Sequence, residues 1–288
     1  MIFGLPLGRI IGLYAGWRMT FLTITATALA VLLYLAFVFP KLASDASFSR
    51  DDLPKLLRNP VVVSVYILSV LFATAYFTAY SYIEPFLKIV AAFSDQGITS
   101  TLMFLGVSGL VGSFVFSHFY NHFRYGIIRA GLLGLVIPFL LWKAAAGGAG
   151  TMVAACLVVG CASTLFNVTF QAELIRHVPM GAAPVAMSIF SGIFNVGIGG
   201  GTWIGGQVTA HGLLPYIGYA GAAIGLVAAV YCFTAYFHFL GRQEKVIKKN
   251  RKKDLHFSIP SSIILIVPIR NELEVIFLNS SVGRAIGC

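Results

Sequence analysis

The sequence predicts an all-α membrane protein, a helical bundle of seven full transmembrane helices preceded by a partial helix. Of 288 residues, 58% are hydrophobic and only 10% are charged. About a quarter of the residues in a soluble domain are charged, so this composition cannot cover a surface in contact with water. The chain is also apolar from near its first residue to residue 241, with only short polar connections. Both observations indicate that lipid surrounds most of the chain.

The first part of the chain holds a short helical segment and three clear spans. The first dozen residues are apolar and helical in pattern, but about 20 residues are needed to cross the hydrocarbon core. We therefore interpret them as the end of a helix whose beginning is missing. Residues 19–39, 61–83 and 97–117 contain no Asp, Glu, Lys or Arg. Each can span the membrane with its backbone hydrogen bonds satisfied internally.

Four further spans follow. Residues 127–142 form a shorter segment with a basic residue near each end, where long side chains can reach the headgroups. Residues 151–172 form the next span. Residues 178–241 contain no Asp, Glu, Lys or Arg but are too long for one helix. We place a break at residues 211–215, His-Gly-Leu-Leu-Pro.

Basic residues divide unequally between alternate connections. Fourteen Lys and Arg residues fall on one side of the predicted membrane and four on the other. The larger group comprises Lys41, Arg50, Lys55, Arg58, Arg124, Arg129, Arg176 and seven residues from Arg242 to Lys253; the smaller comprises Arg9, Arg18, Lys88 and Lys143. The positive-inside rule therefore places the loop of residues 41–59 and the C-terminus in the cytoplasm. We expect residues 242–288 to form a basic tail that is disordered or unrelated to the bundle.

Several classes of function find no support in the residues. The formal charge of +10 follows from membrane topology, so we expect no nucleic-acid partner. The four cysteines form no CxxC pair, and His118 and His122 have no third ligand near them, so we expect neither a metal nor a cofactor. No set of ionisable residues gathers at one membrane depth, so we expect no catalytic residues and no enzyme.

Two glycine ladders predict close helix packing. Gly4, Gly8, Gly12 and Gly16 form the first ladder, and Gly197, Gly201 and Gly205 form the second. A bare glycine face on a helix lets a neighbouring backbone approach closely. Either ladder alone is a general packing device. Together, about 193 residues apart, they suggest two related halves that rock against each other during transport.

Polar side chains follow one face of several predicted spans. The first stripe contains Tyr66, Ser69, Tyr76, Tyr80 and Glu84, the second contains Ser188, Ser191, Asn195 and Thr202, and Asn167 pairs with Gln171. These stripes favour a polar cavity for a small hydroxylated or amphipathic substrate. We expect its path to include Tyr76, Tyr80, Glu84, Asn167, Ser191 and Asn195. Interhelical hydrogen bonding is the alternative interpretation, and it suits any single Ser or Thr better.

Glu84 is the sole acid within a predicted span. It lies about 12 residues past the centre of that span, or ~18 Å at 1.5 Å per residue. This position is near the outer interface, where a carboxylate can be solvated. We therefore expect Glu84 at an outer gate rather than at a deep proton-coupling position.

Three runs of sequence resemble one family. Residues 4–9, Gly-Leu-Pro-Leu-Gly-Arg, with residues 16–21, Gly-Trp-Arg-Met-Thr-Phe, resemble the fifth-helix antiporter motif of the major facilitator superfamily. Residues 78–86 and 186–199 resemble the seventh and eleventh helices of bacterial sugar efflux transporters in its drug:proton antiporter group. The similarity extends over roughly residues 1 to 240.

The resemblance implies a fold of two six-helix halves. Residues 1–40 then end the N-terminal half, residues 41–59 form the cytoplasmic loop between halves, and residues 60–241 form a complete C-terminal half. It also implies a multi-pass protein of the bacterial inner membrane that exports sugars or related small molecules in exchange for protons by alternating access. The same superfamily also includes drug exporters.

Helices one to four of the family have no counterpart in the sequence. Two expectations follow from this difference. The chain is either an N-terminally truncated product that does not transport, or one that depends on a partner for the missing half.

Overall fold

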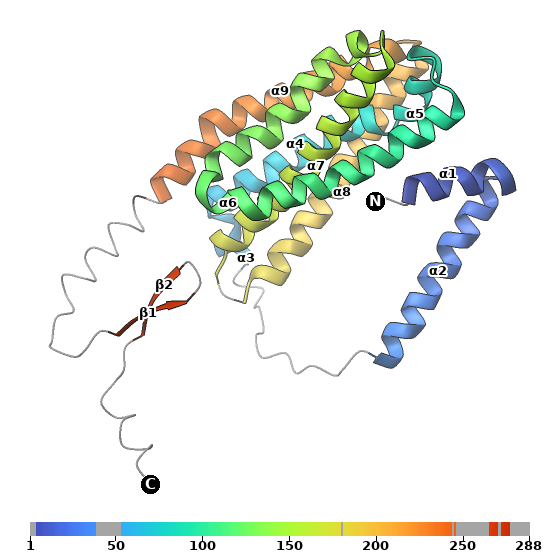
Figure 1. Cartoon of the computed structure of the whole chain (residues 1–288). Coiled ribbons are helices and arrows are strands. Elements are labelled where there is room, and N and C mark those ends of the chain that lie inside the picture. The colour runs from blue at the N-terminus through green and yellow to red at the C-terminus, as the bar shows by residue number, and fades with distance from the viewer. Residues whose placement is uncertain are drawn as a thin grey trace. The chain divides into compact units, whose positions relative to one another are not determined.

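The structure, a computed structural model, describes residues 4–38, 53–179, 181–243, 245, 265–269 and 272–276. Within these residues, six helices are long and apolar enough to cross a membrane (Figure 1). They are Trp17–Val38, Pro60–Val90, Asp95–Ala145, Ala149–His177, Ala183–Ala210 and Leu214–Gln243. This architecture confirms the all-α membrane bundle.

Shorter elements complete the described helices. Helix α1 (Gly4–Ala15) precedes α2 (Trp17–Val38), and α3 (Leu53–Leu57) precedes α4 (Pro60–Tyr80). Helix α5 (Ile83–Pro85) and a π-helical turn, η2 (Phe86–Val90), prolong α4. The last span begins with η3 (Leu214–Tyr216), α9 (Ile217–Tyr231) and a second π-helical turn, η4 (Cys232–Tyr236), and continues as helix to Gln243.

Helix α6 (Asp95–Ala145) contains two of the seven predicted spans. Its backbone leaves helical geometry at Phe123, with φ −126° and ψ 40°. The first half of α6 runs in the same direction as α7 (Ala149–His177), because Gly112 lies near Cys161 and Tyr120 near Glu173. The second half runs in the opposite direction, because Arg124 lies near Glu173 and Gly134 near Ala162. The two halves of α6 are therefore antiparallel, so six helices accommodate seven spans.

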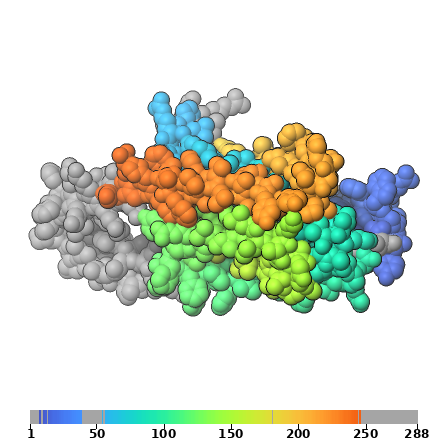
Figure 2. All heavy atoms as spheres, turned by 90° about the horizontal axis from the view of Figure 1, so that it is seen from above, coloured from blue at the N-terminus to red at the C-terminus, as the bar shows by residue number. Residues whose placement is uncertain are grey.

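The predicted break at residues 211–215 is confirmed. Helix α8 (Ala183–Ala210) ends there, and Gly212 follows with a φ of +72°, a conformation that suits glycine. Pro215 then starts the next span near its first position, where a missing N–H costs nothing. Figure 2 shows this last span lying along the second half of α6, where Gly218 packs on Phe139 and Trp142.

The second glycine ladder forms the contact between α8 and α4. A Cβ atom added at Gly197, Gly201 or Gly205 would lie 2.3–2.6 Å from its nearest α4 atom. Two of those atoms are backbone oxygens, so the helices touch backbone to backbone. The first ladder differs, because a Cβ at Gly8 or Gly12 would only reach Thr20 at 3.7 Å, an ordinary contact.

Helices α1 and α2 form a hairpin around Gly16, whose φ is +84°. None of the 22 residues of α2 is buried. Both faces of this apolar helix are therefore exposed in the chain.

The chain divides into two compact units, Met1–Phe239 and Leu240–Cys288. The second unit contains an antiparallel pair of strands, β1 (Leu265–Ile269) and β2 (Glu272–Ile276), with Val267 opposite Glu274. Both strands contain β-branched residues and are separated by two residues, as in a β-hairpin. Of the predicted loop at residues 41–59, residues 41–52 lie outside the described residues.

Candidate functional site

Two tyrosines of α4 form the centre of the candidate site. The rings of Tyr76 and Tyr80 stack with centroids 4.7 Å apart. Ser163 of α7 lies close to the Tyr76 side chain, and its hydroxyl donates to the Gly160 carbonyl oxygen on its own helix at 2.9 Å. Tyr76 is buried and Tyr80 is half-buried. The site therefore offers an aromatic face and hydroxyl groups at one place.

The face of α7 beside these tyrosines is polar. Ser163, Asn167 and Gln171 are spaced four residues apart, so they share one side of the helix, and each is half-buried. The Gln171 side-chain amide donates to the side-chain oxygen of Asn167. Ser163 was not among the residues predicted for the substrate path. Its position four residues before Asn167 could have indicated it.

The structure places Asn195 and Ser191 apart from the tyrosines. Both are exposed, and the Asn195 amide donates to the Ser191 carbonyl oxygen on its own helix at 2.8 Å. Gly197, two residues later, packs on α4. A separation of two residues is about 200° around a helix, so Asn195 lies on the side of α8 that faces away from α4.

Glu84 lies in α5 and is exposed, beyond the end of α4. Close to it, Ser81 and Thr202 share a hydrogen bond of 2.9 Å between their hydroxyl oxygens, and the Tyr82 hydroxyl donates to the Thr202 carbonyl oxygen at 3.1 Å. These bonds join the ends of α4 and α8. Tyr80 and Glu84 therefore stand near one end of the bundle.

A buried ion pair lies at the opposite end of the bundle. Glu173 of α7 is completely buried. The Arg124 guanidinium donates to both carboxylate oxygens. Tyr120 donates to the same carboxylate at 2.5 Å and Tyr236 at 2.9 Å. Four donor groups from two elements, α6 and η4, thus satisfy a charge that burial would otherwise penalise.

The network continues to the start of α4. Arg124 also contacts the His177 ring at 3.5 Å, and the Asn59 side-chain amide donates to the His177 carbonyl oxygen at 3.0 Å. Asn59 at the same time caps α4 by accepting from the Val61 N–H at 3.0 Å. This end of the bundle is therefore tied together by side chains.

Glu173 corrects the expectation that Glu84 is the sole acid within a span. The predicted span ended at residue 172, but the helix continues to His177. Arg124 was expected in a connection and lies inside α6. The sequence places Glu173 and Arg124 at the ends of neighbouring spans, and Tyr120 lies one turn before Arg124. This pattern could have indicated the ion pair.

Two features bear on metal and thiol chemistry. Among the residues that the structure describes, no group of three or more His, Cys, Asp and Glu side chains could hold a metal ion. Cys156, Cys161 and Cys232 are free thiols within helices. Space filling explains these small side chains.

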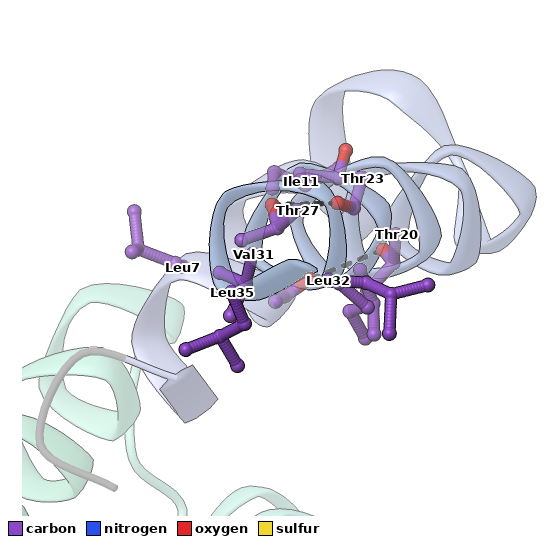
Figure 3. A pocket seen from close by; sticks show the side chains of 11 residues that line it. Leu7, Ile11, Thr20, Thr23, Thr27, Val31, Leu32 and Leu35 are labelled. Atoms are coloured by element: carbon purple, nitrogen blue, oxygen red, sulfur yellow. Dashed lines mark hydrogen bonds between the residues drawn. The ribbon is translucent and has the colours of Figure 1, made fainter. Parts of the chain in front are cut away.

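An apolar groove of about 620 Å³ lies between α1 and α2. Figure 3 shows three threonines of α2 along it, Thr20, Thr23 and Thr27, among aliphatic side chains. Thr20 donates to the Gly8 carbonyl oxygen at 3.4 Å, and Thr27 donates to the Thr23 carbonyl oxygen at 2.8 Å. Because backbone oxygens already satisfy these hydroxyl groups, the groove is suited to apolar contacts.

Comparison with known families gives one match. The family model described as Major Facilitator Superfamily matches residues 1–186, which extend from α1 to the start of α8. The match covers well over half of the 288 residues. It agrees with the bundle of membrane-spanning helices. The chain belongs to the major facilitator superfamily and is a multi-pass membrane transporter.

Proposed function

We propose that this transporter exports sugars or related small hydroxylated molecules by proton antiport with alternating access. The observation that supports this function best is the Tyr76–Tyr80–Ser163 site, which combines stacked rings with hydroxyl groups. A sugar presents an apolar ring face and several hydroxyl groups, so it can stack on one part of this site and hydrogen-bond to the other. The amides of Asn167 and Gln171 extend the polar face.

We further propose a bacterial inner-membrane location with the C-terminus in the cytoplasm. The ion-pair end, with Asn59 and Arg124, then faces the cytoplasm, and the end with Glu84 faces outward. The unequal distribution of basic residues supports this orientation. Asn195 and Ser191 belong to the proposed path as an exposed polar face that can line the opposite side of a cavity.

Glu84 is the proposed proton-responsive residue of the described helices. Glu173 is fully buried and accepts from Arg124, Tyr120 and Tyr236. Protonation of Glu173 would remove the buried negative charge that pairs with Arg124, so Glu173 suits a structural role. Glu84 is exposed, where a proton can enter and leave.

Transport by the purified chain in proteoliposomes tests the function. Radiolabelled lactose and glucose serve as sugar probes and ethidium as a drug probe, each with an imposed pH gradient. We expect gradient-dependent sugar transport that Tyr80→Ala abolishes and Tyr80→Phe reduces. Tyr219→Ala, at an exposed tyrosine of α9, is the matched control. Transport of ethidium alone would favour the drug exporter, and normal sugar transport by Tyr80→Ala would refute the site.

A second candidate is that the chain functions with transmembrane helices from another polypeptide. The observation that favours it is α2, an apolar helix of 22 residues without one buried side chain. The groove between α1 and α2 is lined by Gly8 and three threonines. Small residues of this kind are common where helices pack together in membranes.

Photo-crosslinking from Thr27→Cys, labelled with a benzophenone maleimide in native membranes, tests this arrangement. The product expected is an adduct with a second membrane polypeptide. The matched label at Leu226→Cys, on the exposed face of α9, should give none. Lipid adducts alone at Thr27 would exclude the partner.

A further inference from the structure

Six aromatic rings form a continuous column through the bundle. The neighbouring centroid distances are 4.7 Å for Tyr80–Tyr76, 6.4 Å for Tyr76–Phe72, 3.6 Å for Phe72–Phe166, 4.2 Å for Phe166–Phe170 and 5.7 Å for Phe170–Tyr236. The rings come from three elements, α4, α7 and η4. The column therefore crosses between helices twice rather than following one helix.

The column joins two polar features that are otherwise separate. One end is the candidate site, where the rings of Tyr76 and Tyr80 stack beside Ser163. At the other end, the Tyr236 hydroxyl donates to the buried Glu173 carboxylate at 2.9 Å. The first ring of the column thus belongs to the site and the last ring to the ion-pair network.

The middle of the column has little freedom to move. Phe72, Phe166, Phe170 and Tyr236 are each at most 1% exposed. Phe72 and Phe166 lie nearly parallel, with 3° between their planes. Side chains in such close packing cannot reorient singly, so a displacement of one ring must be taken up by its neighbours.

We propose that Glu173 and Phe170 are positioning residues for the substrate site, acting through the column on the rings of Tyr76 and Tyr80. The ion pair fixes Tyr236, Tyr236 fixes Phe170, and the stacked phenylalanines fix the ring of Tyr76. The statement about the substrate rests on the proposed export function. The statement about the tyrosine rings does not.

The test of ring position uses fluorine NMR and needs no substrate. The full chain is purified in detergent with 3-fluorotyrosine, and the Tyr76 and Tyr80 resonances are assigned by Tyr→Phe substitution. Phe170→Leu and Glu173→Gln are each expected to shift or broaden both resonances. Phe170 cannot act directly on Tyr80, because three rings separate them in the column. A change at Tyr80 therefore reports displacement of the intervening rings.

Phe139→Leu is the matched control, since Phe139 is equally buried and packs on Trp142 outside the column. It should leave the Tyr80 resonance unchanged. If Glu173→Gln does not fold, Tyr236→Phe tests the same link, because it removes only the hydroxyl. Changes confined to Tyr120 and Tyr236, with Tyr76 and Tyr80 unmoved in every folded variant, would overturn the proposal.

Transport kinetics give the second readout. With lactose as the probe, Phe170→Leu is expected to raise the apparent KM by about 2- to 30-fold while Vmax changes little. A purely structural role would instead lower the amount of folded protein and Vmax together. If the wild-type chain moves no probe, the export function fails and the fluorine spectra still decide the role of the column.

Discussion

Arg124 and Glu173, which lie 49 residues apart in sequence, form an ion pair whose carboxylate is completely buried. The pair connects the second half of α6 to α7 at the end of the bundle where Asn59 starts α4. Tyr120 and Tyr236 add their hydroxyl groups to the same carboxylate. A single buried carboxylate therefore holds together both halves of α6, α7 and η4 at one end of the bundle.

Removal of one partner of this pair should be strongly destabilising. Arg124→Ala leaves the Glu173 carboxylate buried with its charge unpaired, which costs about 3–5 kcal/mol of unfolding free energy. The double substitution Arg124→Met with Glu173→Leu should cost less, because neither charge is then buried. SDS titration in mixed micelles measures these free energies. A double variant less stable than the single one would contradict this explanation.

The glycine contact between α8 and α4 gives a matched comparison. A Cβ at Gly201 would lie 2.5 Å from the Thr74 carbonyl oxygen, whereas a Cβ at Gly199 would meet nothing within 4 Å. Gly201→Ala should therefore destabilise the protein by about 1–3 kcal/mol through overpacking. Gly199→Ala should be neutral or slightly stabilising in the same titration. Equal effects of the two substitutions would show that the helices are further apart than in this structure.

The two roles of Asn59 can be separated by substitution. Its side chain accepts from the Val61 N–H as the cap of α4 and donates to the His177 carbonyl oxygen. Asn59→Ala removes both bonds and should cost about 0.5–2 kcal/mol. Asn59→Asp keeps the cap acceptor and loses the donor, so its loss should be smaller. Thermal unfolding of the three proteins in one detergent measures the order. An equal loss for Asn59→Asp and Asn59→Ala would show that the cap acceptor contributes nothing.

Ser163 should affect substrate affinity. Ser163→Ala removes one hydroxyl group from beside Tyr76. A hydrogen bond from this hydroxyl to the substrate would be worth about 0.5–1.5 kcal/mol, so its loss should raise the apparent KM for lactose by about 2- to 12-fold. Ser117→Ala is the control, because Ser117 is exposed and bonds to Phe114 on its own helix. An unchanged KM in Ser163→Ala would remove this hydroxyl from the substrate site.

Long apolar runs and their breaks made most of the fold predictable. The break at residues 211–215 follows from Gly212 and Pro215, whose backbone preferences are local. The Arg124–Glu173 pair could not be predicted in this way, because it depends on the register of α6 against α7. Asn195 shows the same limit. Helical spacing placed it on a polar stripe, but only the packing of Gly197 on α4 decides which direction that stripe faces.

The sequence indicated the continuity of α6 and the β1–β2 strand pair less clearly. Residues near Phe123 contain neither proline nor a cluster of turn residues, so the reversal of α6 was expected as an ordinary polar connection. Strands β1 and β2 lie in a stretch where apolar and polar residues mix, and the family match ends before it. Tyr76 and Tyr80 were predicted together from spacing alone, because residues four apart on one helix share a face.

Sugar-driven proton movement is the most direct test of proton-coupled sugar export. Lactose is added outside proteoliposomes that contain the wild-type chain, have no pH gradient and hold a pH-sensitive dye in the external medium. Antiport predicts that lactose entry drives protons outward, so the medium acidifies, and that Tyr80→Ala abolishes the signal. Alkalinisation of the medium, or lactose entry without any pH change, would contradict antiport.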